Sequence, residues 1–469
     1  MTGQLPQFKA LRIGAVVFCL PFSFHVGPRA FAEAGTGKGP LTVALEEVPV
    51  WKVDPGIVSS FTRGGYASVR DGAFANVKYP ELKSETPQYG EVHLGGNGYH
   101  FVLDHSEGEA GTYDRLYFDT DRDRDLSSES PAKALTDVPG VLVRNSSTIK
   151  EQIFFNGFEV PFDFGPAGRR DVELMLRIWV YESRSPRLSF FPVAVHMGKF
   201  EVAGVSYTAF LGYEHSIEGR LDQASSALFI AAEGDAPGRW WGGDRLNATH
   251  LLGGRYFQFS CTPTGDKLFV RPYDGELGTL ELGPGGRDVE KLEISGSLRG
   301  KDTAVAVADG LEGGWPQPTR KCELPAGDYY PAYLTMRIGD IRISVSNNYH
   351  VDAQGRSRND REVVHGIKIR ADKPYVLDFS NKPGVAFVQP KDKQRVTPGS
   401  EVKVEAVLLD PVLDIMIRRL DDMTHVEKRT YNTPDGREHT YERAPSLDPK
   451  VTVARTGGEI VAEGVMPFG

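Results

Sequence analysis

Short runs of alternating apolar and polar residues recur along most of this chain of 469 residues. In one run, Leu334, Met336 and Ile338 are apolar, whereas Thr335 and Arg337 between them are polar. Successive side chains of a strand point to opposite faces, so this period of two predicts strands with one buried face. The clearest such runs are 92–104, 172–182, 187–197, 333–346 and 401–410.

Turn-forming residues separate these runs. The chain has 52 glycines and 31 prolines, and clusters that contain them lie between the strand-like runs, for example at 263–266, 283–286 and 433–436. Such clusters form tight turns. No long segment combines a helical period with helix caps. The pattern therefore predicts an all-β protein built from tandem β-sandwich domains.

Length and turn-rich links together predict the domain organisation. At about 100–200 residues per domain, a chain of this length suggests three or four domains. Links rich in glycine or proline lie at 165–168, 283–288 and 371–383. The predicted units are a leader at 1–32, an N-terminal β domain at 33–165, a second β domain at 166–285, a third β-sandwich domain at 286–378 and a C-terminal domain at 379–469.

The first 32 residues have the pattern of a secretory signal peptide. Lys9 and Arg12 supply the positive region, 13–26 is apolar and uncharged, and Ala30 and Ala32 are the small residues before the cleavage point. A transmembrane helix needs about 20 apolar residues, and this run is shorter and contains a proline. A buried strand is the alternative interpretation. The leader predicts a secreted or periplasmic protein with no membrane span after cleavage.

Charge and cysteines refine this picture. The formal charge is −9, and removal of Lys9, Arg12 and Arg29 with the leader changes it to −9 − 3 = −12. An acidic protein is a poor partner for nucleic acid or anionic lipid. It suits a cationic ligand, although solubility alone also explains the charge. Cys19 lacks the small residue that precedes a lipoprotein cysteine, so a soluble product is predicted.

Cys261 and Cys322 remain in the mature chain. In an oxidising compartment they could form a disulfide, which the chain-entropy model values at about 4 kcal/mol for so long a loop. Two separate buried thiols are the alternative. Two cysteines are too few for a thiolate metal site.

An acidic segment at 116–130 is the most specific local signal. It has the sequence LYFDTDRDRDLSSES, with a carboxylate at every second position. Ca²⁺ takes about 6–8 oxygen ligands, which such a loop can supply. The candidate ligands are Asp119, Asp121, Asp123, Asp125, Ser127 and Glu129. The alternative is a solvated strand end with weak Asp–Arg ion pairs.

This segment resembles the D-x-D-x-D-G loops of EF-hand and dockerin proteins. It resembles more closely the LYFD-x-N-x-D-G-D-L loops of uncharacterised exported bacterial β-domain proteins. The resemblance implies a structural Ca²⁺ ligated by the aspartates and the Asp125 carbonyl, with Leu126 packed inward. The sequence departs from the pattern at Arg124, where the family has glycine, and at Ser130, where EF-hands have glutamate.

Two further segments resemble known β modules. LPAGDYY at 324–330 resembles the LPAG-x-Y hairpins of carboxypeptidase-regulatory-like and Cna-B-like sandwiches. That resemblance implies a turn at Gly327, with Tyr329 in the core, in a structural or adhesive module. The block from 379 onward resembles bacterial immunoglobulin-like domains in its spacing of strands.

Trp240, Trp241 and Asp244 form a candidate ligand site. Exposed indoles stack on sugar rings and a neighbouring carboxylate accepts hydrogen bonds from hydroxyls, whereas core packing is the alternative role for the tryptophans.

The chain has no G-x-S-x-G, H-E-x-x-H, Walker A or G-x-G-x-x-G motif, which disfavours an enzyme. We expect an exported, non-catalytic binding or scaffold protein with a polysaccharide or a surface protein as partner. A carbohydrate-active protein and a cell-surface adhesion component are the alternatives.

Overall fold

The computed structural model describes residues 40–106, 112–144, 148–181, 186–214, 217–235, 245–312, 315–349, 366–390, 394–395, 397, 399–432 and 438–468. Regular structure in these ranges is almost entirely strand, which confirms the predicted all-β class. The helical turns are short: η1 (Val50–Lys52), α1 (Pro55–Phe61), η2 (Gly140–Leu142) and η3 (Gly165–Ala167). Within the described ranges, no helix is long and apolar enough to cross a membrane.

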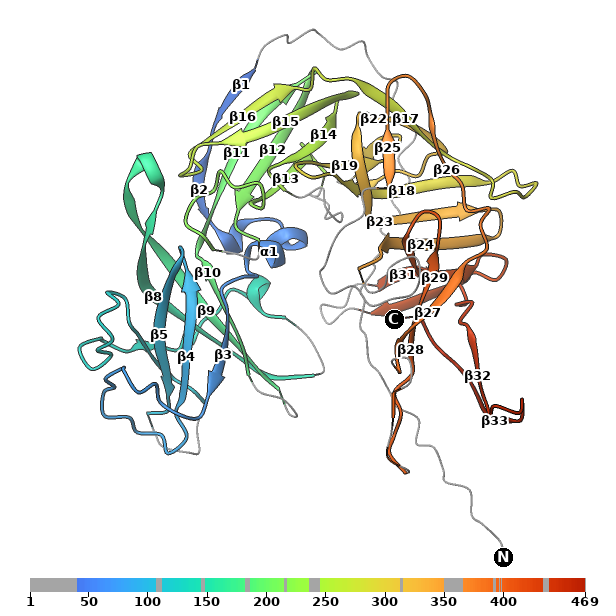
Figure 1. Cartoon of the computed structure of the whole chain (residues 1–469). Helices are drawn as coiled ribbons and strands as arrows, with labels where there is room; N and C mark the ends of the chain where they lie inside the picture. The colour runs from blue at the N-terminus through green and yellow to red at the C-terminus, as the bar shows by residue number, and fades with distance from the viewer. Residues whose placement is uncertain are drawn as a thin grey trace, which may run out of the picture.

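An eight-stranded antiparallel sheet forms one end of the molecule (Figure 1). Its strands, in spatial order, are β7 (Ala132–Lys133), β6 (Arg115–Phe118), β5 (Asn97–Asp104), β4 (Gln88–Leu94), β3 (Tyr66–Arg70), β10 (Arg187–Pro192), β9 (Arg169–Tyr181) and β8 (Ile149–Asp163). In β4, Val92 and Leu94 are buried whereas Glu91 and His93 are exposed. The period of two thus directs one face of this sheet into the core.

A four-stranded sheet packs beside it. Its order is β13 (Ala227–Ala232), β12 (Val205–Gly212), β11 (Ala194–Val202) and β2 (Glu46–Pro49). The largest hydrophobic cluster spans both sheets and the start of the next one, from Val43 to Val270, with Phe101, Phe155 and Phe190 fully buried. Residues far apart in the chain therefore share one core.

A twelve-stranded sheet continues along the molecule (Figure 1). Its path is β1 (Leu41–Ala44), β16 (Lys267–Pro272), β15 (Arg255–Cys261), β14 (Ala248–Leu252), β19 (Ala304–Val307), β18 (Leu292–Arg299), β23 (Gly327–Ile338), β24 (Ile341–Asn347), β29 (Ile415–Asp422), β28 (Glu405–Asp410) and β27 (Gly384–Gln389), and β25 (Ile367–Ile369) also pairs with β23. A three-stranded sheet of β22 (Lys321–Pro325), β17 (Leu277–Leu282) and β26 (Tyr375–Leu377) shares with it a second hydrophobic cluster.

Three hairpins complete the described strands: β20 (Leu311–Glu312) with β21 (Trp315–Pro316), β30 (Glu427–Asn432) with β31 (Glu438–Arg443), and β32 (Lys450–Ala454) with β33 (Ile460–Val465). The C-terminal block thus contributes β27–β29 to the large sheet, and its other strands form separate hairpins. The immunoglobulin-like description of this block stays a prediction.

Strand pairing crosses each internal domain boundary predicted from the sequence. The boundary at 165/166 falls at the turn of the β8–β9 hairpin, where Gly165 and Gly168 adopt φ of +65° and +79°. The boundary at 285/286 is crossed by the parallel pairing of β14 with β19, and that at 378/379 by the pairing of β24 with β29. The described structure therefore does not divide the chain at these points.

Cys261 and Cys322 are both free and buried. They belong to the first and the second hydrophobic cluster, respectively. The disulfide considered from the sequence is thus not formed, and the alternative of two separate buried thiols describes the structure. Burial raises the pKa of each thiol to about 12, which keeps both protonated.

The LPAGDYY segment does not form the hairpin that its resemblance implies. β22 pairs with β17, whereas β23 pairs with β18, β24 and β25, so the chain passes from one sheet to another at Ala326. Tyr329 does enter the core as expected. Its side chain is 1% exposed, and its hydroxyl donates to the Pro325 carbonyl over 2.8 Å.

Candidate functional site

The acidic segment forms the loop between β6 and β7, at the end of the eight-stranded sheet. Asp119 is the first residue after β6, and its backbone N–H donates to the His100 carbonyl of β5 over 2.9 Å. This bond extends the strand pairing by one residue. The backbone of Asp119 is thereby held by the sheet.

Aspartates hold the loop in successive turns. The Asp121 carboxylate accepts from the Asp123 backbone N–H over 3.1 Å, and Asp123 accepts from the Asp125 N–H over 2.6 Å. Asp125 in turn accepts from the Ser127 N–H over 3.0 Å. An aspartate that accepts from the backbone two residues later stabilises a tight turn. The alternation of aspartates seen in the sequence therefore shapes the loop itself.

A backbone contact with residue 78 anchors the far side of the loop. The Lys78 N–H donates to the Arg124 carbonyl over 2.8 Å, and the Leu126 N–H donates to the Lys78 carbonyl over 2.9 Å. Leu126 is fully buried beside Val102 and Tyr117, in agreement with the prediction that it packs inward.

Arg124 and Arg122 have left-handed backbone conformations, with φ of +65° and +63°. Arg124 thus adopts a conformation that glycine adopts more easily, and glycine occupies this point in the loops that the segment resembles. The Arg122 guanidinium donates to the Asn97 side chain and lies 5.7 Å from the centre of the Tyr99 ring. The loop keeps its sharp turn despite the missing glycine.

The Asp119 carboxylate lies at the centre of the candidate metal site. Its side chain is only 1% exposed, neither of its oxygens has a hydrogen-bond partner of good geometry, and the backbone donor that favours its charged form is the Arg124 amide. One ligand oxygen from each of Asp119, Asp121 and Glu129 lies within 4.8 Å of the other two. Burial raises the pKa of Asp119 above its ordinary value, and the nearby Asp121 and Asp123 raise it further, whereas the Arg124 amide and His100 oppose this effect.

Glu129 is held in place by the residue after Asp119. Its Oε1 accepts from both the backbone N–H and the hydroxyl of Thr120, over 2.9 and 2.7 Å. These two bonds place the carboxylate beside Asp119, although the two residues are ten positions apart in the chain. Thr120 was not predicted, and only its position between two candidate ligands would have drawn attention to it.

The remaining predicted ligands have different roles. Asp125 forms an ion pair with Lys78 over 2.7 Å and also accepts from the Ser127 hydroxyl. The hydrogen bond from Lys78 lowers the pKa of Asp125. Asp123 lies outside the group of three. The structure thus gathers Asp119, Asp121 and Glu129, and it uses Asp125 and Ser127 to build the loop. Trp240, Trp241 and Asp244 lie outside the described residues.

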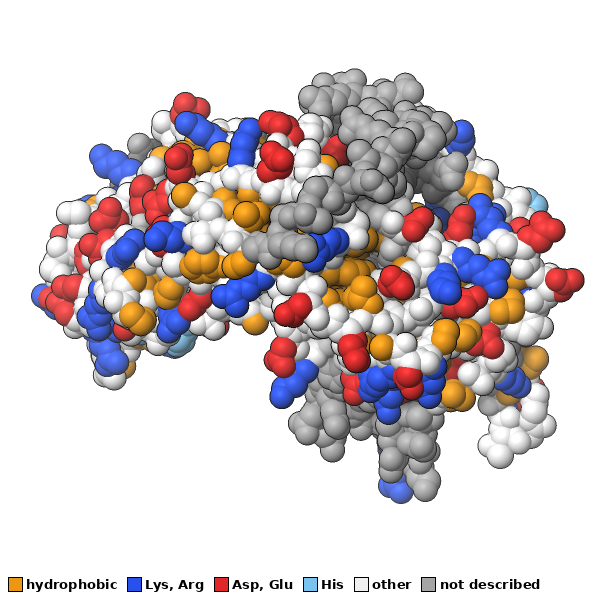
Figure 2. Space-filling view, turned by 90° about the horizontal axis from the view of Figure 1, so that it is seen from above, with side chains coloured by type: hydrophobic (Ala, Val, Ile, Leu, Met, Phe, Trp, Pro, Cys, Tyr) orange, Lys and Arg blue, Asp and Glu red, His pale blue; other side chains and the backbone are white. Residues whose placement is uncertain are grey.

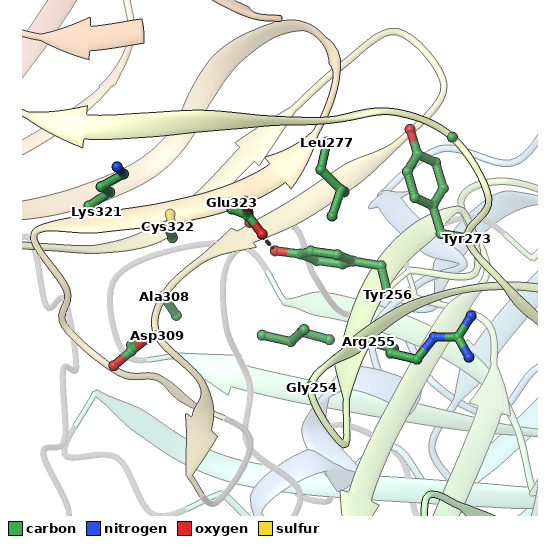
Figure 3. Close-up of a pocket in the computed structure, with 12 residues that line it drawn as sticks. Gly254, Arg255, Tyr256, Tyr273, Leu277, Ala308, Asp309, Lys321, Cys322 and Glu323 are labelled. Carbon is green, nitrogen blue, oxygen red and sulfur yellow. Dashed lines mark hydrogen bonds between the residues drawn. The ribbon is translucent and has the colours of Figure 1, made fainter. Parts of the chain in front are cut away.

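A groove of about 550 Å³ lies where the twelve-stranded and three-stranded sheets meet (Figure 3). Tyr256 of β15 crosses it, and its hydroxyl donates to the Glu323 carbonyl of β22 over 2.7 Å. Tyr273 and Leu277 line one end, and Lys321 and Cys322 line the other. No sequence motif pointed to this groove, because its walls come from four separate stretches between 251 and 323.

Basic and acidic side chains are interspersed over the face seen in Figure 2, with apolar side chains between them. Comparison with protein-family models, with curated proteins and with solved structures found no match to this chain.

Proposed function

We propose that this chain is an exported, non-catalytic binding or scaffold protein in which the loop after β6 holds a structural Ca²⁺. The buried Asp119 carboxylate carries this proposal. A buried carboxylate with too few hydrogen-bond donors is strongly destabilised unless it binds a proton or a cation. Asp121 and Glu129 lie against it, and three crowded carboxylates favour a cation.

We expect Ca²⁺ rather than a smaller ion because the segment resembles the Ca²⁺ loops of EF-hand and dockerin proteins. Ca²⁺ binds oxygens at about 2.3–2.6 Å, so two oxygens on opposite sides of it lie about 4.8 Å apart. The three ligand oxygens lie within that span of one another. Mg²⁺ needs a tighter octahedral shell at about 2.0–2.1 Å and gives up its waters reluctantly. Water would complete the larger shell.

The role of such an ion is to stabilise the fold. The loop connects β6 with β7 and contacts the segment at Lys78, so the ion would fasten an edge of the eight-stranded sheet. An ion that binds only the folded protein raises its stability by mass action. The leader at 1–32 supports export, the negative charge of the mature chain suits a cation ligand, and the absence of motifs for catalysis supports a binding or scaffold role.

Thermal unfolding of the mature chain, residues 33–469, tests this proposal. We expect the melting temperature measured in EDTA to rise in millimolar Ca²⁺ and to rise much less in millimolar Mg²⁺. Asp121→Asn should reduce the rise. Asp302→Asn, which alters an exposed carboxylate between β18 and β19, is the matched control and should leave the rise unchanged. An equal rise in wild type and Asp121→Asn would place the ion elsewhere, and no rise in wild type would reject the proposal.

A further inference from the structure

We propose that the groove crossed by Tyr256 binds a neutral oligosaccharide. This inference names a ligand for the binding role proposed above and rests on that role, but it concerns a different part of the chain from the Asp119 loop. The volume of the groove, about 550 Å³, is within the range of about 300–1,000 Å³ that small-ligand sites occupy.

The lining of the groove combines aromatic rings with apolar side chains. Tyr273 contributes a partly exposed phenol ring, Leu251 and Leu277 contribute aliphatic surface, and Tyr256, which is only 6% exposed, supports them from beneath. The C–H faces of a sugar ring pack against such surfaces, while its hydroxyls remain free to form hydrogen bonds. An amphipathic ring that presents an apolar face and a polar edge is suited to such ligands.

The charges around the groove are balanced. Arg255 and Lys321 are cations, and Asp309 and Glu323 are anions, so their formal sum is zero. None of these four side chains forms a salt bridge among the described residues, and all four are exposed. Balanced charges do not attract a polyanion or a polycation. They do offer both donors and acceptors, which is what hydroxyl groups require.

The groove is also held in shape before any ligand arrives. The Tyr256 hydroxyl is fixed on the Glu323 carbonyl, and the Tyr273 hydroxyl donates to the Glu276 carbonyl over 3.2 Å. The Tyr273 ring folds over Gly275, where an added Cβ would lie 2.4 Å from the tyrosine oxygen. Gly254, at the adjacent hairpin turn, has open space where a side chain would be. A preformed site avoids the entropic cost of ordering its side chains on binding.

The experiment is a binding titration of the mature chain with β-1,4-linked hexaoses of glucose, mannose, xylose and N-acetylglucosamine. A polyuronate of similar length and a mixture of extended peptides serve as comparison ligands. We expect saturable binding of at least one neutral hexaose. Tyr273→Ala should weaken that binding about fivefold to tenfold, whereas Tyr273→Phe, which keeps the ring, should stay within about twofold of wild type.

Tyr66→Ala is the matched control, because Tyr66 is an exposed tyrosine on β3 at the other end of the molecule. It should bind the sugar like wild type. Leu277→Arg should block the groove without removing a core residue, since Leu277 is 39% exposed. Circular dichroism of each variant shows whether a loss of binding reflects a loss of fold.

Three results would overturn the inference. The first is that no neutral hexaose binds at millimolar concentration. The second is that the polyuronate or the peptides bind more tightly than the neutral hexaoses. The third is that the double substitution Trp240→Ala and Trp241→Ala abolishes sugar binding while Tyr273→Ala leaves it unchanged. The titrations are run in EDTA and in Ca²⁺. A Ca²⁺-dependent rise in melting temperature without sugar binding would reject the groove assignment alone and leave the proposed Ca²⁺ loop in place.

Discussion

Gly90 and Phe101 face each other across β4 and β5, and the phenyl ring occupies the space that a side chain at Gly90 would need. A Cβ added at Gly90 would lie 2.1 Å from Cζ of Phe101. The ring itself is fully buried in the largest hydrophobic cluster and contacts Phe190 at 5.5 Å between ring centres. The absent side chain of one residue therefore permits the packing of the other.

Gly90→Ala should destabilise the protein by about 1–3 kcal/mol, because the ring must move within a close-packed core. Urea unfolding measures the change. Gly384→Ala, in β27, is the matched control: its added Cβ meets nothing within 4 Å, so we expect a change near zero or a small gain. Combining Gly90→Ala with Phe101→Leu should cost less than the sum of the two single changes. Strict additivity would contradict the packing described here.

Asp119→Asn should stabilise the protein in EDTA at neutral pH and abolish the response to Ca²⁺. The substitution removes a buried negative charge whose pKa burial raises, and it also removes one of the three candidate ligands. Chemical denaturation in EDTA and in Ca²⁺ measures both effects. Loss of stability in EDTA would show that the Asp119 carboxylate has a partner that stabilises its charge.

The pH dependence of stability follows from the raised pKa of Asp119. The folded-state pKa is above the unfolded value of about 3.9, so the folded protein binds the proton more tightly. The stability that this proton provides is fully present below the unfolded pKa, and it is lost as the pH rises through the folded pKa. In EDTA, the stability of wild type relative to Asp119→Asn should therefore fall as the pH is raised from about 4 toward neutrality. A difference that does not change with pH would contradict the raised pKa.

Arg124→Gly should stabilise the loop by about 1 kcal/mol, because glycine adopts positive φ without the steric cost that a Cβ imposes. We also expect tighter Ca²⁺ binding, since the turn would be formed at less cost. Ala203→Gly is the matched control, because Ala203 has φ of +53° in the β11–β12 turn, far from the loop in sequence. It should raise the melting temperature without changing the affinity for Ca²⁺.

Two free thiols per mature chain should be detected after denaturation without reductant. Cys261 and Cys322 are buried with raised pKa values, so neither should react quickly with a thiol reagent in the folded protein. A chain that yields no thiols after denaturation, and that migrates faster on a non-reducing gel, would instead contain the disulfide.

The sequence predicted local features well, because neighbouring residues determine them. The alternation at Leu334, Met336 and Ile338 reflects one buried face of β23, and all three side chains are in the core. The acidic segment likewise predicted Asp119, Asp121 and Glu129 as candidate ligands, since a loop brings together residues that are close in the chain.

Features that depend on distant residues were not predictable in the same way. The turn at Gly165 has the composition of a linker, yet it joins two paired strands, because glycine serves both purposes. Lys78 anchors the acidic loop from 47 positions away. The groove combines Tyr256 with Glu323, and nothing in either local sequence indicates that the two meet.

β1 has a consequence for the order in which this protein can fold. Its residues, Leu41–Ala44, pair with Lys267–Val270, more than 200 positions later in the chain. During synthesis at about 5–20 residues per second, the first strand therefore waits roughly 11–45 s before its partner exists. Through that interval β1 has no neighbour in its final sheet, and the large sheet cannot be completed. We therefore expect this chain to remain dependent on factors that bind unfolded protein until its middle third has been made.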